Sequence, residues 1–309
     1  MKKITVIGGA AADLKAFSPN KLQPGTSNIG SFSESLGGVA FNIARNLALL
    51  KEEIFFISTA GNDTYGKLIQ DECKKLNISF CNIPSKKPTA VYNAIFTNEG
   101  ELFAGISAMD IFDSITPEKI KNLEPEFKKS KMVICDTNIS EKTLETVALI
   151  CNQNNIPFSA DPTEKDKSYK LKKILPYTDY IFPNEEELEE LANIKITNPD
   201  DKIKAGKKLI ASGCKNVIVT CGEEGALFIS QNETISKKSP KILPRDITGA
   251  GDALLACFLK SILDGESNTS ALKAGIASAI ATIKVYESVN KDISMKLIKK
   301  YKEDFSDEI

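Results

Sequence analysis

The stretch DITGAGDALLACFL, residues 246–259, places two glycines between an acidic residue and a long apolar run. The run after Asp252 is apolar almost all round, which predicts a buried helix. Glycines let the backbone turn tightly, and the first-turn amides of a helix are unpaired and attract anions. We therefore expect the amides of Gly249, Ala250 and Gly251 to form an anion hole beside the Asp252 carboxylate. The alternative is that Asp252 simply caps the helix.

The rest of the chain alternates between predicted strands and predicted helices. Short apolar runs that read as strands lie at 2–9, 53–61, 131–136, 156–161, 178–184 and 216–222. Segments with helical spacing of apolar residues include 37–51, 63–77 and 141–155. This alternation predicts an α/β fold, a doubly wound and mostly parallel sheet flanked by helices. Because no repeat or Pro-rich linker interrupts it, we treat 1–309 as a single domain.

Two segments depart from the alternation. Residues 14–31 are polar and contain two prolines and two glycines. Residues 89–106 resemble two strands around a turn at 98–100. A hairpin in this position is either an extension of the sheet edge or a lid over a site.

The composition excludes several classes of partner. With 40 basic and 41 acidic residues the net charge is -1, which provides no electrostatic footprint for nucleic acid or for a membrane surface. No stretch approaches the ~18 apolar residues of a membrane-spanning helix. The seven cysteines form no C-x-x-C pair, and most lie in apolar runs. We expect a cytoplasmic protein with reduced cysteines.

The sequence contains no histidine. This excludes Ser-His-Asp and Cys-His catalysis as well as histidine-ligated zinc, so acid–base chemistry falls to Asp, Glu, Lys, Tyr or Cys. Neither a Walker A motif nor G-x-G-x-x-G after the first strand is present, so nucleotide binding by those two routes is not supported.

Polar residues follow several predicted strands. Asn184 and Glu187 lie one helical turn apart and provide oxygen ligands that could hold Mg²⁺ through water, although a helix capping box explains them equally well. A further strand-end loop carries Thr220, Gly222 and Gly225. Open α/β sheets bind ligands at this edge.

A second glycine pair precedes the predicted helix at 37–51. Gly37 and Gly38 permit the close approach of a polyhydroxy ligand, while Asn42 and Asp13 could bond to its hydroxyls. The alternative is that these residues serve turns, as Asn and Asp commonly do.

The motifs occur in an order that resembles one family. GGVAFN (37–42), NEEE (184–187), TCGEEG (220–225) and DITGAGD (246–252) together resemble the PfkB, or ribokinase-like, carbohydrate kinases over essentially the whole chain. The resemblance implies ATP-dependent phosphorylation of a sugar hydroxyl on a Rossmann-like core with a small β-sheet lid. The segments 14–31 and 89–106 fall where that lid belongs.

The resemblance also assigns roles to residues. Asp252 would be the general base, and the amides of the Gly249–Gly251 loop would hold the transferring phosphoryl group. Asn184 and Glu187 would organise Mg²⁺ and the phosphates. The residues that would line the ATP site are Thr220, Gly222, Gly225, Thr248, Gly249 and Gly251. In many relatives the loop that Asp246 begins also binds a monovalent cation, so K⁺ dependence is an open expectation.

The lead-in SNIG (27–30) before GGVAFN resembles the pseudouridine kinase branch of the family. Ser27 and Asn28 would touch the base or ribose. The ribose hydroxyls would be held by Asp13, Gly38 and Asn42. The implied reaction converts pseudouridine and ATP into pseudouridine 5′-phosphate and ADP.

Two groups of alternatives remain open at this point. Ribose, fructose or another nucleoside such as adenosine would suit a different member of the family, and a non-catalytic nucleoside sensor is the alternative outside enzymes. Apolar lid residues such as Phe96 and Phe103 would permit a homodimer formed through the lid.

Overall fold

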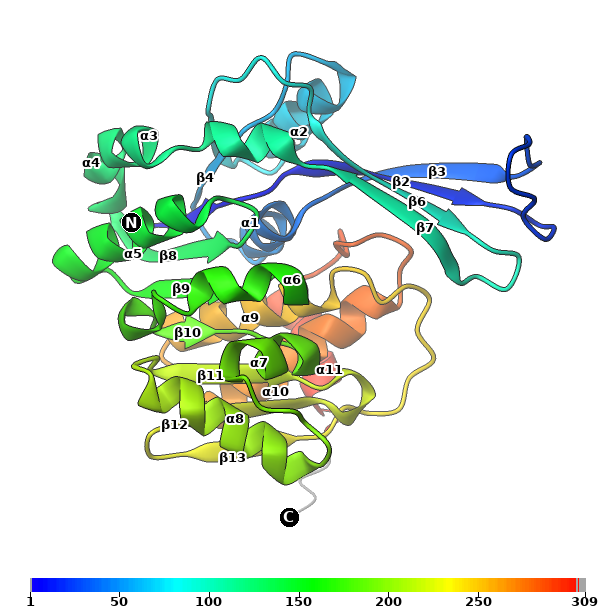
Figure 1. Cartoon of the computed structure of the whole chain (residues 1–309). Coiled ribbons are helices and arrows are strands. Elements are labelled where there is room, and N and C mark those ends of the chain that lie inside the picture. Colours follow the sequence, from blue (N-terminus) through cyan, green and yellow to red (C-terminus); the bar gives the residue numbers. More distant parts are fainter. Residues whose placement is uncertain (1, 304, 306–309) are drawn as a thin grey trace.

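The strands of the protein form two separate sheets. A computed structural model describes residues 2–303 and 305, and over these residues there is a nine-stranded sheet and a four-stranded sheet (Figure 1). The order of the main sheet is β13-β12-β11-β10-β9-β8-β1-β4-β5. Its strands are β1 (Lys3–Ile7), β4 (Ile54–Ser58), β5 (Ser79–Asn82), β8 (Ser130–Asp136), β9 (Phe158–Asp161), β10 (Tyr180–Ile181), β11 (Asn216–Thr220), β12 (Ala226–Ser230) and β13 (Thr234–Lys237).

The main sheet is parallel except at one edge. β1 pairs in parallel with both β4 and β8, and the parallel pairing continues through β9 and β10 to β11. Only β12 and β13 run antiparallel to their neighbours. The central strands are rich in apolar residues because both faces are covered: Ile4 and Val6 pack on one face and Ile7 on the other.

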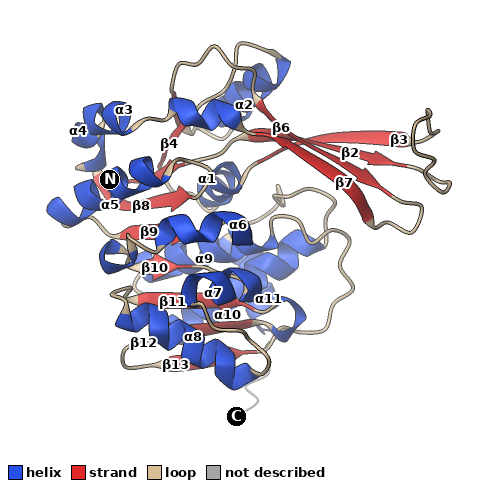
Figure 2. Cartoon of the chain, viewed as in Figure 1, coloured by secondary structure: helices blue, strands red, loops and turns tan. Residues whose placement is uncertain are grey.

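Helices cover both faces of the main sheet (Figure 2). Their bounds are α1 (Val39–Leu49), α2 (Thr64–Lys75), α3 (Pro117–Asn122), α4 (Glu124–Phe127), α5 (Glu141–Gln153), α6 (Lys165–Ser168), α7 (Glu185–Ala192), α8 (Pro199–Ala211), α9 (Ala250–Leu263), α10 (Asn268–Ile283) and α11 (Met295–Glu303). Leu144, Leu188 and Leu209 bury α5, α7 and α8 against one face. Leu47, Leu255 and Ile276 bury α1, α9 and α10 against the other. The predicted doubly wound α/β architecture is confirmed.

The second sheet is the lid. Its order is β3-β2-β6-β7, and it extends away from the body of the molecule (Figure 1). The strands are β2 (Ala11–Phe17), β3 (Ser31–Gly37), β6 (Ala90–Phe96) and β7 (Leu102–Ala108). β2 pairs in parallel with β6 at its centre, while β3 and β7 are antiparallel edge strands.

The lid strands do not coincide with the two segments that departed from the alternation. Residues 89–106 contain β6 and most of β7, whereas 14–31 holds only the second half of β2 and the connection to β3. The serines and glycine of β3, SFSESLG, lack the β-branched residues by which a strand is recognised. Its strand conformation comes from pairing with β2.

No helix within residues 2–303 is long and apolar enough to cross a membrane.

Candidate active site

Asp252 and Asn42 meet at the centre of the site, although 210 positions separate them in the chain. The Nδ2 atom of Asn42, one turn into α1, donates to Oδ2 of Asp252 over 2.8 Å. Asp252 lies in the first turn of α9, where Gly249 rather than Asp252 takes the N-cap position. The capping alternative for Asp252 is therefore wrong, and its carboxylate is free to act elsewhere.

The surroundings of Asp252 change its acidity. Its side chain is 8% exposed, and this burial raises the pKa of Asp252 to about 7. The negative charges of Asp136, Asp13 and Glu187 raise it further, against the opposing hydrogen bond from Asn42. A carboxylate with a pKa near neutrality can accept a proton from an alcohol at physiological pH, as a general base must.

The loop before α9 has a backbone that requires glycine. Gly249 has φ 79°, in the left-handed region, and a Cβ there would lie 2.0 Å from the carbonyl oxygen of Ser288. A Cβ on Gly251, by contrast, would meet nothing within 4 Å. The loop thus lies against the backbone of Ser288 at Gly249 and is open at Gly251.

The amides of this loop are only partly paired. The amide of Ala250 donates to the carbonyl oxygen of Ile247 over 3.3 Å, so it is engaged in a turn. Within the described residues the amides of Gly249, Gly251 and Asp252 have no acceptor. Unpaired amides at a helix N-terminus bind anions. Of the three amides expected to form the anion hole, those of Gly249 and Gly251 are therefore unpaired within the described residues, and that of Ala250 is engaged.

The glycine pair at 37–38 makes room for Asp13. A Cβ on Gly37 would lie 2.0 Å from Oδ2 of Asp13, so that carboxylate lies directly over the glycine. Gly38 has φ 99° and caps α1, and a Cβ there would lie 2.6 Å from the carbonyl oxygen of Gly9. Burial raises the pKa of Asp13 to about 6, against the lowering effect of Lys15 and with a further increase from Asp246.

Asp136 was not selected from the sequence, yet it organises this part of the site. It ends β8, is fully buried, and its Oδ2 accepts from the amides of Gly9 and Ala40 at 2.9 and 3.1 Å. These bonds tie β8 to the turn after β1 and to the start of α1, and so position Gly38 and Asn42. The sequence signal that could have identified Asp136 is an acidic residue at the end of an apolar run predicted to be a buried strand.

Asn184 and Glu187 form the capping box of α7. Oδ1 of Asn184 accepts from the Glu187 amide at 3.0 Å, and Oε2 of Glu187 accepts from the Asn184 amide at 2.8 Å. Burial raises the pKa of Glu187 to about 7; the bond from Asn184 opposes this, and the charges of Glu164 and Glu186 add to it. The capping interpretation is correct, and Oε1 of Glu187 still has no partner within the described residues.

The acidic residues around Asp252 do not form a metal cage. No group of three or more acidic or cysteine side chains in the described part of the chain could hold a metal ion. Asp161, at the end of β9, has a pKa well above its ordinary value because it is buried and close to the charges of Glu187, Asp252 and Asp136. The carboxylate oxygen that could meet a Mg²⁺ ion through water is Oε1 of Glu187, which has no partner within the described residues.

The β11 loop lies beside the α7 cap. Thr220 forms a bridge with Asn184, and its amide donates to the carbonyl oxygen of Pro183 over 3.0 Å. Gly222, with φ 54°, faces open space, whereas a Cβ on Gly225 would lie 2.0 Å from the carbonyl oxygen of Lys237. Gly222 therefore borders open space, while Gly225 is required for packing against β13.

Ser27 and Asn28 lie at the distal end of the lid, in the connection between β2 and β3 (Figure 1). Both are exposed. The Asn28 side chain accepts from the amide of Gln23 at 2.9 Å and donates to the carbonyl oxygens of Gln23 and Thr26 at 3.1 and 3.2 Å. The structure does not bring these two residues to Asp252 within one chain.

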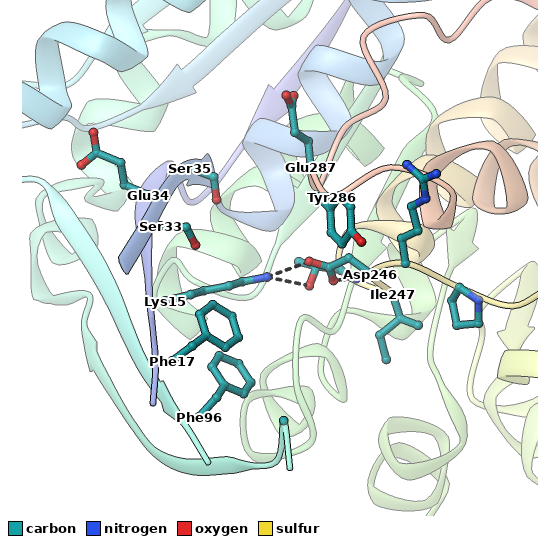
Figure 3. A pocket seen from close by; sticks show the side chains of 14 residues that line it. Lys15, Phe17, Ser33, Glu34, Ser35, Phe96, Asp246, Ile247, Tyr286 and Glu287 are labelled. Atoms are coloured by element: carbon teal, nitrogen blue, oxygen red, sulfur yellow. Dashed lines mark hydrogen bonds and ion pairs between the residues drawn. The ribbon is translucent and has the colours of Figure 1, made fainter. Parts of the chain in front are cut away.

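A cavity of about 820 Å³ separates the lid from the loop before α9 (Figure 3). The lid contributes Lys15 and the stacked rings of Phe17 and Phe96, whose centroids are 4.9 Å apart. Residues 244–248 form the opposite wall. Asp252 is not among the residues that line this cavity, whereas Asp246 and Thr248, in the loop that leads to Asp252, are.

The structure combines a buried carboxylate, neighbouring unpaired amides and a β-sheet lid on a doubly wound sheet, as the resemblance to carbohydrate kinases led us to expect. Residues 1–293 match the family model of pfkB family carbohydrate kinases. The chain belongs to this family, whose members transfer a phosphoryl group from ATP to an alcohol.

Individual relatives resemble the chain over nearly its whole length. The pseudouridine kinase of Escherichia coli K12 is 27% identical over 94% of this chain and 94% of its own. The guanosine-inosine kinase of Exiguobacterium acetylicum is 29% identical over 92% of this chain and 95% of its own. Among solved structures, a carbohydrate kinase from Agrobacterium tumefaciens superposes with a TM-score of 0.86 at 29% identity, covering 98% of this chain and 97% of that one.

Proposed function

We propose that this kinase phosphorylates the 5′-hydroxyl of pseudouridine, giving pseudouridine 5′-phosphate and ADP. The observation that carries the chemistry is the buried Asp252, bonded to Asn42 and adjoining the unpaired amides of Gly249 and Gly251. The choice of acceptor rests on the SNIG lead-in at 27–30 and on the likeness to the E. coli pseudouridine kinase.

In this proposal Asp252 takes the proton of the 5′-hydroxyl. The 5′ oxygen then forms a bond to the γ-phosphorus of ATP as the bond to the ADP oxygen breaks. The amides of Gly249 and Gly251 stabilise the charge on the transferring group, as positioned donors do in phosphoryl transfer. Asp13, Asn42 and the bare backbone of Gly38 hold the ribose hydroxyls.

We assign the ATP side of the site to the end of β11 and the loop that follows it, together with Thr248. Thr220 and Gly222 line the nucleotide, with Gly225 holding their loop in shape, and Thr248 contacts the phosphates. Glu187, oriented by Asn184, would hold Mg²⁺ through water. When bound, Mg²⁺ neutralises charge on the phosphates.

We also propose that the protein is a homodimer formed through the lid. The lid exposes large apolar side chains, with Phe32 60%, Phe103 55% and Ile106 69% exposed. Phe32 and Ile106 are paired with Ala16 and Asn93, on the face of the lid opposite Lys15. Because Ser27 and Asn28 cannot reach Asp252 in their own chain, a contact with substrate would have to come from a second copy.

The test is ADP release by the purified protein with ATP, Mg²⁺ and K⁺ across pseudouridine, uridine, adenosine, guanosine, inosine, ribose and fructose. Turnover confined to pseudouridine, and reduced about 10²–10⁴-fold in Asp252→Asn, would support the proposal. Turnover on guanosine and inosine instead would retain the role of Asp252 and reject the acceptor. Pseudouridine binding without any turnover would favour a sensor.

A further inference from the structure

A lysine of the lid lies on the loop that leads into the anion hole. Lys15 extends from β2, and its Nζ lies 2.8 Å from Oδ2 of Asp246 (Figure 3). It also lies 3.5 Å from Oγ1 of Thr248. The ammonium is 22% and the carboxylate side chain 19% exposed, so this pair is partly shielded from solvent.

The strand geometry explains how Lys15 reaches this place. Residues two apart on a strand point to the same face, so Lys15 shares a face of β2 with Asp13 and Phe17. The Asp13 carboxylate lies over Gly37, and Phe17 lines the cavity. The ammonium therefore projects into the space between the lid and the loop, where the proposed substrate and phosphates meet.

Both oxygens of Asp246 already have partners. Oδ1 accepts from the Thr248 amide at 2.8 Å, and Oδ2 accepts from Lys15. Asp246 is therefore a carboxylate paired with a cation from the same chain.

This arrangement bears on the monovalent cation that the family resemblance implied at Asp246. A K⁺ ion on this carboxylate would have to replace the ammonium or lie close to it. Two positive charges about 4 Å apart repel by roughly 4 kcal/mol near a protein surface. With Lys15 in place, the Asp246 side chain does not fit a K⁺ ligand.

We propose that the Lys15 ammonium is the built-in cation of the anion-hole loop, so that this kinase turns over without K⁺. The inference rests on the proposed role of the Gly249–Gly251 loop. Lys15 neutralises Asp246, and through Thr248 it holds the residue that precedes Gly249. Without it, a bare carboxylate would lie beside the site of a triphosphate and oppose its binding.

The first experiment measures cation binding without turnover. Melting temperatures of the wild type, Lys15→Met and Lys21→Met are compared in KCl, NaCl and choline chloride at equal ionic strength. Lys21 is an exposed lysine of the same lid and controls for the lost charge. We expect the melting temperature of the wild type to differ by no more than about 1 °C among the three salts, and the same for Lys21→Met. Specific stabilisation of the wild type by KCl would overturn the proposal.

The second experiment measures turnover in the same salts. We expect equal kcat for the wild type in KCl and choline chloride, and a fall of about tenfold or more in Lys15→Met, equivalent to roughly 1.4 kcal/mol of barrier. Lys15→Arg should retain most of the rate. A K⁺-dependent wild type, or an unimpaired Lys15→Met, would overturn the proposal. Absence of turnover on every acceptor would reject the proposed reaction, and the melting experiment would still decide the role of Lys15.

Discussion

The hydrogen bond from Asn42 to Asp252 joins the first turn of α1 to the first turn of α9 over 2.8 Å. It connects the residue proposed to hold a substrate hydroxyl with the residue proposed to deprotonate one. Because it lowers the pKa of Asp252 against burial and nearby carboxylates, it keeps the base partly ionised near neutral pH. In the proposed reaction, this single contact would couple acceptor binding to proton transfer.

The pH dependence of the rate should follow Asp252. A base with a pKa of about 7 is inactive when protonated, so kcat/KM should rise with pH through about 7 and level off above it. Asn42→Ala should move this limb to higher pH, because the bond that lowers the pKa is lost. The check is a pH–rate profile from pH 5.5 to 9 for both proteins. A wild-type profile that is flat across neutrality would rule out Asp252 as the titrating base.

Asp252→Asn should stabilise the fold while reducing turnover about 10²–10⁴-fold. The folded protein raises the pKa of Asp252 to about 7, whereas the unfolded chain ionises this group near its ordinary 3.8. The stability it contributes is therefore present at low pH and lost as pH rises through 7. At pH 8 the free energy of unfolding of the variant should exceed that of the wild type by roughly 2–4 kcal/mol, since each pKa unit is worth about 1.4.

The difference in unfolding free energy between Asp252→Asn and the wild type should shrink toward pH 5. Urea unfolding of the two proteins at both pH values is the measurement, and the difference between variant and wild type removes the contributions of the other buried acids. A gain in stability that is the same at pH 5 and pH 8 would argue against a buried ionised Asp252.

The variants Gly249→Ala and Gly251→Ala should distinguish a glycine that the fold requires from one whose open side is available to a ligand. At Gly249 the positive φ and the 2.0 Å clash with the Ser288 carbonyl oxygen predict a loss of at least about 2 kcal/mol of stability. At Gly251 the Cβ meets nothing and replaces a helical glycine, so stability should be unchanged or rise by about 0.5–1 kcal/mol.

Kinetics of the stable Gly251→Ala variant then test the anion hole. The proposed phosphoryl group occupies the open space beside Gly251, so the added methyl group should raise the KM for ATP or lower kcat. Wild-type kinetics in this variant would place the phosphates elsewhere.

Removal of Asp136 should damage both the fold and acceptor binding. Asp136→Ala leaves the buried amides of Gly9 and Ala40 without their acceptor, which should cost about 2–4 kcal/mol of unfolding free energy. The acceptor KM should rise, because the same bonds position Gly38 and Asn42. Unfolding and steady-state kinetics are measured together, with Asp113→Ala, at an exposed acidic residue, as control. An unchanged acceptor KM would restrict Asp136 to a structural role.

Glu187→Gln should weaken the response to Mg²⁺ without disturbing α7. Glutamine still accepts the bond from the Asn184 amide, so the capping box remains, but the charge facing the proposed metal is lost. The Mg²⁺ concentration for half-maximal rate should rise about tenfold, while the exposed Glu186→Gln should behave as wild type. Equal Mg²⁺ titrations for the two variants would remove Glu187 from the metal site.

Much of the fold could be predicted because its signals are local. Predicted strands at 2–9, 53–61 and 131–136 contain β1, β4 and all but the first residue of β8, and the helix predicted at 37–51 contains α1. An apolar run indicates a strand that is covered on both faces, and every central strand of a parallel sheet is covered in this way. Helical periodicity indicates a helix with one buried face. β3 escaped prediction because its strand character depends on its partner.

The sequence by itself determined the class of chemistry, because GGVAFN (37–42), NEEE (184–187), TCGEEG (220–225) and DITGAGD (246–252) occur in the order that resembles the PfkB kinases. The absence of histidine excluded histidine-based catalysis. The tertiary structure alone decided which residues act on Asp252 and its loop. Lys15, Asp136 and Asn42 are distant from Asp252 in the chain, and the strength of a hydrogen bond or a charge depends on distance and burial rather than on spacing along the chain. A helix start can be read from adjacent residues, but the acidity of the carboxylate it carries is set by the packing of α1, the lid and the sheet edge around it.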